Sequence, residues 1–264
     1  MSGGVRLFFL LMCLAAPAAA QSAPAAPAAQ EPESSFTFLP RYAFHLTAEH
    51  LSSDDDRFTW DANYGGELDV FDYGRGRFTF YANYQVITGD QFRAFDANQG
   101  NYILGGRVSA RAGGTEVAGV FHHLSRHLSD RPKLQAVDWN MIGVRVGRPV
   151  QAGPVSLTTA VDIRGVVQHS YVDYRWELDG GVRAEYPFTN HVALVSRGDL
   201  RLVGVDGSRN RGTQTGARGE GGVRLSGKAA AIELFVAVER RVDPYPLQFG
   251  TANWFTAGFK LLRD

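Results

Sequence analysis

Hydrophobic and polar residues alternate with a period of two along most of the chain after residue 35. In residues 57–70, RFTWDANYGGELDV, the even positions are apolar, aromatic or glycine, whereas the odd positions carry every charge. Residues 101–111 and 174–186 repeat this alternation. Because successive side chains of a strand point to opposite faces, each segment predicts a β-strand with one apolar and one polar face.

About twelve such segments follow one another, and the turns between them have a regular order. The segments begin near residues 40, 57, 77, 101, 115, 137, 154, 173, 191, 214, 230 and 252. Short turns at 72–76, 112–114, 148–153, 187–190 and 226–229 alternate with connections that are mostly longer and polar. Up-and-down outer-membrane barrels have this order, with short periplasmic turns and longer outer loops. The sequence therefore predicts an all-β fold, a twelve-stranded antiparallel transmembrane barrel with both termini in the periplasm.

The direction of the alternation separates this barrel from a soluble one. A soluble sandwich or lipocalin-like barrel packs its apolar face inward. Twelve strands of roughly ten residues enclose more space than their apolar side chains fill. We therefore expect a lipid-facing apolar belt and a polar lumen.

The N-terminus has the features of an export signal. Arg6 precedes an apolar run at residues 7–14, and small residues at 18–20 form a cleavage pattern, so residues 1–20 are interpreted as a signal peptide. The apolar run is shorter than the roughly 20 residues needed to span a bilayer. Residues 21–35 are rich in Ala and Pro and predict a flexible leader, which leaves 36–264 for the barrel.

Composition narrows the functional classes. The chain has 27 basic and 27 acidic residues, so no basic excess suggests a nucleic-acid partner. The only cysteine, Cys13, lies in the signal peptide, which excludes thiolate chemistry in the mature protein. The expected partners are outer-membrane lipids, lipopolysaccharide and the barrel-assembly machinery. Predicted lumen positions mix Arg with Asp and Glu, which favours filling of the lumen over a selective pore.

Residues 119–130, GVFHHLSRHLSD, contain three of the seven histidines and hold the main candidate site. The alternation places His123 and Ser125 on the lipid face, at the outer end of their strand. A symmetric hairpin turning near residues 131–132 then puts His123 opposite Asn140 and Ser125 opposite Asp138. Serine, histidine and asparagine have the roles of nucleophile, base and orienting group in acyl hydrolysis. We therefore assign Ser125, His123 and Asn140 as candidate catalytic residues.

Two other interpretations of this stretch stay open. Ser129 and His127 form a rival pair with the same spacing. In a structural role, the cluster lies at the rim of the barrel, where Arg126, Arg131 and Lys133 contact anionic lipid head groups.

Metal binding is a third interpretation, in which His123, His127 and Asp130 are the ligands. In an extended strand the two histidines are about 13 Å apart, too far for one ion unless the loop folds back. No metal ligand is therefore assigned.

The same residues carry two resemblances. His123-Leu124-Ser125 and Trp139-Asn140 resemble outer-membrane phospholipase A, a twelve-stranded barrel with a lipid-facing His-x-Ser pair, and lipid A deacylase barrels also use such a pair. This resemblance implies ester hydrolysis in the outer leaflet, and it alone implies calcium. Both families place Asn after the Ser, where this chain has Arg126. Residues 115–165 resemble a family of uncharacterised outer-membrane proteins with a His-x-Ser-x-His-Leu-x-Asp motif.

The sequence thus leaves two functions open. One is an integral outer-membrane barrel with a structural or narrow-pore role. The other is an outer-leaflet lipid hydrolase. Whether the protein is an enzyme is not decided by the sequence.

Overall fold

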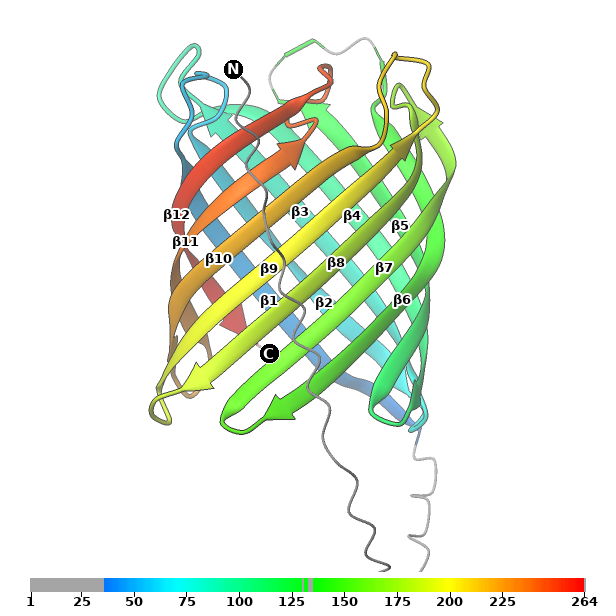
Figure 1. Cartoon of the computed structure of the whole chain (residues 1–264), viewed down its shortest axis with the longest axis vertical. Coiled ribbons are helices and arrows are strands. Elements are labelled where there is room, and N and C mark those ends of the chain that lie inside the picture. Colours follow the sequence, from blue (N-terminus) through cyan, green and yellow to red (C-terminus); the bar gives the residue numbers. More distant parts are fainter. Residues whose placement is uncertain (1–35, 130, 133–134, 264) are drawn as a thin grey trace, which may run out of the picture. The chain divides into compact units, whose positions relative to one another are not determined.

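Twelve antiparallel strands close into a barrel in the computed structural model, which describes residues 36–129, 131–132 and 135–263 (Figure 1). The strands are β1 (Thr37–Leu51), β2 (Trp60–Asp72), β3 (Arg77–Gly89), β4 (Asp96–Ala112), β5 (Thr115–Leu128), β6 (Asp138–Ala152), β7 (Val155–Ser170), β8 (Tyr174–Pro187), β9 (Val192–Val205), β10 (Gln214–Ser226), β11 (Ala231–Val242) and β12 (Thr251–Arg263). The predicted all-β barrel of twelve strands is confirmed. The predicted signal peptide and leader lie outside the described residues.

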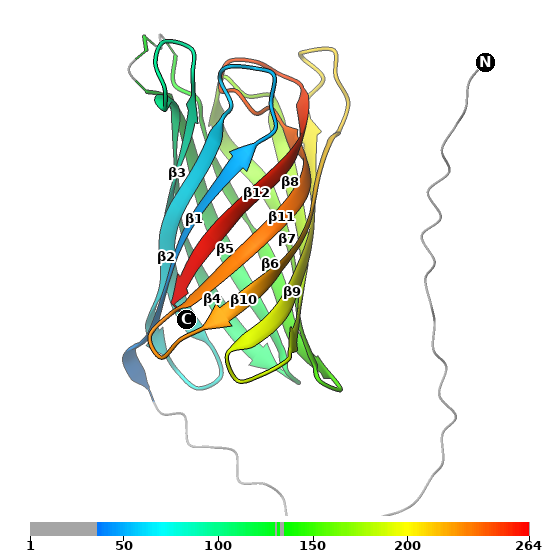
Figure 2. The ribbon, with the colours of Figure 1, turned by 90° about the vertical axis from the view of Figure 1, so that its left-hand side faces the viewer.

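Each strand pairs with its sequence neighbours, and β12 closes the ring on β1. One end of the barrel carries the short turns 73–76, 113–114, 153–154, 188–191 and 227–230. The other end carries the connections 52–59, 90–95, 129–137, 171–173, 206–213 and 243–250. Figure 2 shows these two ends, and β1 begins and β12 ends at the short-turn end. In the part of the chain that the structure describes, no helix is both long and apolar enough to cross a membrane.

Apolar side chains point outward along the strands. In β11, the outward-facing Leu234 and Val238 are 54% and 61% exposed. Glu233, whose side chain points into the lumen, is fully buried. A closed barrel whose exterior is apolar satisfies its backbone hydrogen bonds internally and suits a hydrocarbon surrounding. The exterior is therefore the membrane-facing surface, as the alternation predicted.

One predicted turn begins later than expected. Residues 148–152 belong to β6, and the turn itself is at 153–154, where Gly153 has a positive φ of 59°. Pro149 pairs with Thr158 of β7, but the pairing of β5 with β6 ends at Glu116 and Gly147. Pro149 therefore has a strand neighbour on one side only, which is the kind of edge position where proline is tolerated in a sheet.

The interior holds two apolar clusters at the long-loop end. One consists of Val137, Trp139, Met141, Val172, Tyr174 and Val203, and the other of Leu51, Phe58, Ile87 and Trp254. The remainder of the lumen is lined mainly by arginines and carboxylates in ion pairs, among them Arg218 with Glu49 and Arg183 with Glu233. The lumen is therefore filled differently at its two ends.

Candidate functional site

The candidate site lies on β5, whose alternation separates its two faces clearly. Ala118 and Val120 are buried in the lumen, whereas Val117 and Phe121 are exposed on the exterior. His123, Ser125 and His127 continue the outward-facing positions toward the long-loop end of the strand. The membrane-facing placement expected for His123 and Ser125 is therefore what the structure has.

The register of β5 with β6 is the one that the symmetric hairpin predicts. His123 pairs with Asn140, and Ser125 pairs with Asp138. The Nδ1 of His123 donates a 2.7 Å hydrogen bond to the Oδ1 of Asn140. This bond leaves Nε2 as the basic nitrogen of a neutral ring, which is the tautomer that a general base requires.

Ser125 contacts a different histidine from the one assigned to it. Its Oγ lies 2.8 Å from the Nε2 of His127, two residues further along the same face. The His127 ring also packs edge-on against Tyr102 of β4, the strand neighbour of Ser125, with ring centroids 5.3 Å apart. The structure thus brings together members of the two predicted pairs: Ser125 with His127, and His123 with Asn140.

A residue of β7 joins this exterior network. The Nδ2 of Asn140 donates to the Oε1 of Gln168, and the Nε2 of Gln168 donates to Asp138 at 3.3 Å. Gln168 faces outward because the pairing of β6 with β7 shifts register beside Val167, which is itself 60% exposed. Sequence reasoning missed Gln168 because a β-bulge reverses the alternation and leaves no mark in a pattern of period two.

Two further site residues fall in different surroundings from those expected. The Arg126 side chain points into the lumen, where it donates to the backbone carbonyls of Asp243 and Pro244, so it does not face lipid head groups. Its even position on β5 shares the lumen parity of Ala118 and Val120, so the alternation itself places it there. Ser129 lies in the turn after β5, where its N–H donates to the carbonyl of Asn98.

Arg131 contributes to loop structure on the long-loop rim. It donates hydrogen bonds to Asp96, Gln91 and the carbonyl of Ala97, and its guanidinium lies 5.0 Å from the Phe92 ring centroid. Lys133 lies outside the described residues.

The exterior network is unusual for its surroundings. Polar side chains that face hydrocarbon are energetically costly, and they concentrate at functional positions. The network comprises the Ser125–His127 contact and, beside it, the chain of hydrogen bonds from His123 through Asn140 and Gln168 to Asp138. Together these residues supply a hydroxyl, two imidazoles, two amides and a carboxylate on three adjacent strands. Chemically, this set supplies a nucleophile, proton acceptors and orienting groups, which together suit acyl transfer. Among the described residues, which leave out Asp130, no group of three or more His, Cys, Asp or Glu is arranged to hold a metal ion.

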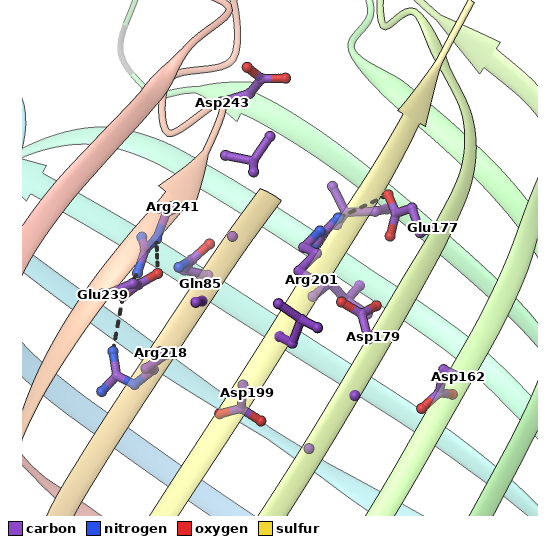
Figure 3. A pocket seen from close by; sticks show the side chains of 18 of the residues that line it. Gln85, Asp162, Glu177, Asp179, Asp199, Arg201, Arg218, Glu239, Arg241 and Asp243 are labelled. Atoms are coloured by element: carbon purple, nitrogen blue, oxygen red, sulfur yellow. Dashed lines mark hydrogen bonds and ion pairs between the residues drawn. The ribbon is translucent and has the colours of Figure 1, made fainter. Parts of the chain in front are cut away.

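The lumen contains a second candidate region, a cavity of about 610 Å³ beneath the long-loop end. Its wall carries the arginines Arg126, Arg145, Arg164, Arg197, Arg201, Arg218, Arg240 and Arg241 and the carboxylates of Asp162, Glu177, Asp179, Asp199, Glu239 and Asp243. Figure 3 labels the six carboxylates and the arginines Arg201, Arg218 and Arg241. His122 also lines the cavity, 2.9 Å from the Tyr81 hydroxyl through Nδ1. A cavity of about 230 Å³ shares part of its wall, including Gln85, Arg218 and Arg241, and another of about 310 Å³ shares only Arg145 with it.

Known proteins share the fold at low sequence identity. No family model matches the chain, and no curated protein matches its sequence. The outer membrane phospholipase of Salmonella typhi, solved as a dimer with bound calcium, has a TM-score of 0.54 and 12% identity over 84% of this chain and 90% of that chain. An outer membrane channel from Pseudomonas putida F1 has a TM-score of 0.53 and 8% identity over 90% of this chain and 99% of that chain.

A third solved structure, outer membrane phospholipase A from Escherichia coli, has a TM-score of 0.52 and 13% identity over 86% of this chain and 98% of that chain. At these identities the likeness shows the fold alone. The closed twelve-stranded ring and its apolar exterior define the class: this chain is an integral β-barrel with the fold of outer-membrane proteins.

Proposed function

We propose that this protein is an outer-membrane barrel that hydrolyses acyl esters of outer-leaflet lipids, with Ser125 as the nucleophile. The observation that carries this proposal is the 2.8 Å contact between the Ser125 Oγ and the His127 Nε2 on the membrane-facing surface. A candidate general base has to lie within hydrogen-bond reach of the proton that it removes, and His127 satisfies this condition.

The chemistry uses Ser125, His127, the lipid ester and one water molecule. The Ser125 hydroxyl attacks the ester carbonyl carbon while its proton passes to the Nε2 of His127. The protonated imidazole then gives this proton to the departing alcohol oxygen of the lipid, which leaves an acyl-serine. Water, deprotonated by the same nitrogen, attacks the acyl-serine, and the proton returns to the Ser125 Oγ as the fatty acid leaves.

His123 is the alternative base, and a different feature favours it. Asn140 already holds the His123 ring in the tautomer with a free basic Nε2. Ser125 lies two residues from each histidine, and its Oγ has three staggered positions about χ1. The set assigned from the sequence, Ser125, His123 and Asn140, therefore differs from the observed contact in the choice of base, and the rival pair contributes His127 without Ser129.

The location of the network supports the proposal. If both termini are periplasmic, the long-loop end faces outward, and the network lies at the depth of the outer leaflet and of lipopolysaccharide. The resemblance of His123-Leu124-Ser125 and Trp139-Asn140 to outer-membrane phospholipase A, and of the His-x-Ser pair to lipid A deacylases, agrees with such a substrate. Export and assembly by the barrel-assembly machinery belong to the same proposal.

Calcium enters only through the phospholipase resemblance. Calcium in proteins takes six to eight oxygen ligands. The carboxylate described in this network is that of Asp138, which already accepts from Gln168. One chain thus supplies few of the ligands, and the reaction above includes no step that depends on the ion.

The test is fatty-acid release from phospholipid and from lipid A by the purified, refolded full chain, with and without calcium. Ser125→Ala is expected to reduce release by at least about 10³-fold, because removal of a nucleophile leaves only binding and electrostatic contributions. His127→Ala should produce a comparable loss if His127 is the base. His123→Ala should produce that loss instead if His123, which Asn140 orients, is the base.

Ser129→Ala is the matched control, since it removes a neighbouring hydroxyl that is not in the observed network. Its rate should equal that of the unmodified protein. The proposal is wrong if refolded protein releases no fatty acid from either lipid, or if Ser125→Ala retains the full rate.

A further inference from the structure

The connection between β11 and β12, residues 243–250, reaches across the long-loop mouth of the barrel. Arg126 donates through Nη1 to the carbonyl of Asp243 at 2.7 Å and through Nη2 to the carbonyl of Pro244 at 2.8 Å. In a ring of twelve strands, β5 and β11 are six strands apart in either direction and are therefore diametrically opposed. The loop and the Arg126 side chain together therefore span the lumen.

Asp243 is the point at which the loop is most strongly held. Its carboxylate accepts from Arg211 at 2.9 Å, from the Tyr174 hydroxyl at 2.6 Å and from the N–H of Gly250 at 2.7 Å. Asp243 also has a positive φ of 45°, a backbone conformation that a non-glycine residue keeps only when its surroundings stabilise it. Asp243 therefore joins the loop to β5, to β8 and to the connection 206–213.

The electrostatics of this contact keep the Arg211 guanidinium charged. Burial lowers the pKa of Arg211, but its hydrogen bonds to Asp173 and Asp243 outweigh that effect and raise the pKa above its ordinary value. The Arg211 guanidinium is charged at any working pH, so the contact depends on Asp243 rather than on the protonation of Arg211.

Aromatic and apolar contacts fix the rest of the loop. Tyr245 packs against the apolar cluster of Leu51, Phe58, Ile87 and Trp254, and Leu247 packs against the cluster around Trp139. Phe249 lies under the guanidinium groups of Arg209 and Arg211, with distances of 3.9 and 4.5 Å to its ring centroid. The loop therefore connects both apolar clusters and covers the space between them.

A polar space begins directly beneath this cover. Asp243 and Pro244 are part of the wall of the 610 Å³ cavity. The 230 Å³ cavity shares part of this wall and extends the space along the lumen, and the 310 Å³ cavity meets it at Arg145. Figure 3 shows Asp243 at the upper end of this wall, with Arg241, Glu239 and Arg218 on one side and Arg201 and Glu177 on the other. A hydrophilic lumen with a short loop reaching across one mouth has the parts of a gated conduit.

We propose that the lumen is a pathway for small hydrophilic solutes and inorganic ions, and that residues 243–250 are its gate, latched at Asp243. The closed loop blocks the long-loop mouth, and its displacement joins the cavity to solvent. Because arginines and carboxylates both line the cavity, the open pathway discriminates weakly between small anions and cations. This activity is independent of ester hydrolysis at Ser125, which lies on the opposite surface of the barrel wall.

Ionic conductance of the refolded full chain in a planar bilayer with potassium chloride tests the gate. The unmodified protein should remain mostly closed. Asp243→Ala removes the carboxylate that binds Arg211 and Tyr174 and should raise the open probability by at least about tenfold. Replacement of residues 244–249 by two glycines should leave the pathway open throughout, with a reversal potential near zero in a salt gradient.

Asp206→Ala is the matched control, because Asp206 is an exposed aspartate of the neighbouring connection 206–213 and accepts from the N–H of Ser208 within its own turn. Its open probability should equal that of the unmodified protein, and Ser125→Ala should conduct normally as well. Resistance of each variant to heat in gel electrophoresis verifies that the barrel is folded.

Two results would overturn the proposal. A folded glycine-replacement variant that carries no current would show that the ion pairs of the lumen block passage without the loop. Equal conductance of the unmodified protein and both loop variants would show that the loop closes nothing.

Discussion

The two ends of the lumen are filled by different interactions. At the long-loop end, the apolar clusters around Trp139 and Trp254 pack together with residues of the connection 243–250. Further along the lumen, buried carboxylates are surrounded by cations: Glu233 contacts Arg183, Arg224 and Lys260. The apolar clusters exclude water because their side chains are closely packed, whereas each buried charge of the ion pairs requires an oppositely charged partner.

This difference shows how a barrel with a polar interior can still be closed. Some ion pairs join adjacent strands, as Arg145 of β6 joins Asp162 of β7. Others, such as Arg218 of β10 with Glu49 of β1, connect strands three positions apart. Such pairs cross part of the lumen and support its filling, while the apolar mouth determines whether solvent enters from the long-loop end.

The largest expected effect comes from the apolar end. Trp254→Ala removes a ring that is 6% exposed and lies 5.2 Å from the Phe58 ring centroid. Truncation of a buried tryptophan should lower the free energy of unfolding by about 3–5 kcal/mol. Urea unfolding of the barrel in lipid vesicles measures this loss. Phe92→Ala, at a ring that is 79% exposed, should change stability by less than about 0.5 kcal/mol. Equal losses in the Trp254 and Phe92 variants would show that the apolar cluster does not stabilise the barrel.

Glu233→Gln tests the charged part of the lumen. The substitution keeps the shape but leaves Arg183, Arg224 and Lys260 without their shared carboxylate, so we expect a loss of about 3 kcal/mol in the same unfolding measurement. Asp199→Asn breaks a pair with Arg197, which is half exposed, and should cost at most about 1 kcal/mol. A Glu233 variant as stable as the Asp199 variant would show that water replaces the missing charge.

Leu247→Ala separates stability from closure at the mouth. Leu247 is partly buried against the cluster around Trp139, so its truncation should lower the free energy of unfolding by only about 1–2 kcal/mol. The same variant should open the conductance pathway more often than the unmodified protein does. An unchanged open probability with the expected loss of stability would mean that this contact does not hold the gate closed.

The smallest effect is expected on the membrane face. Asn140→Leu removes hydrogen bonds to His123 and Gln168 but replaces an amide by an apolar side chain on a surface that faces hydrocarbon. These contributions oppose each other, so stability should change by no more than about 1 kcal/mol in either direction. Unfolding in vesicles checks this expectation, and a loss above about 2 kcal/mol would assign the network a structural role.

The alternation of apolar and polar residues predicts much of the fold and part of the candidate site. The alternation in residues 57–70 and its repeats predicted the twelve strands, because the period of a strand is two and one face must meet lipid. The same rule, applied to a symmetric hairpin, placed His123 opposite Asn140, as the structure has it. Parity also determined the lumen placement of Arg126, although its role was first interpreted from charge alone.

The amino-acid sequence by itself determined the architecture and the face on which each regular residue lies, since both follow from backbone geometry and from the medium on each side of the wall. The tertiary structure alone decided that Ser125 contacts His127, that the bulge at Val167 turns Gln168 outward, and that the connection 243–250 crosses the mouth to Arg126. These outcomes depend on side-chain rotamers, on one extra residue in a pair of strands, and on contacts between residues more than one hundred positions apart, which leave no periodic signal in the chain.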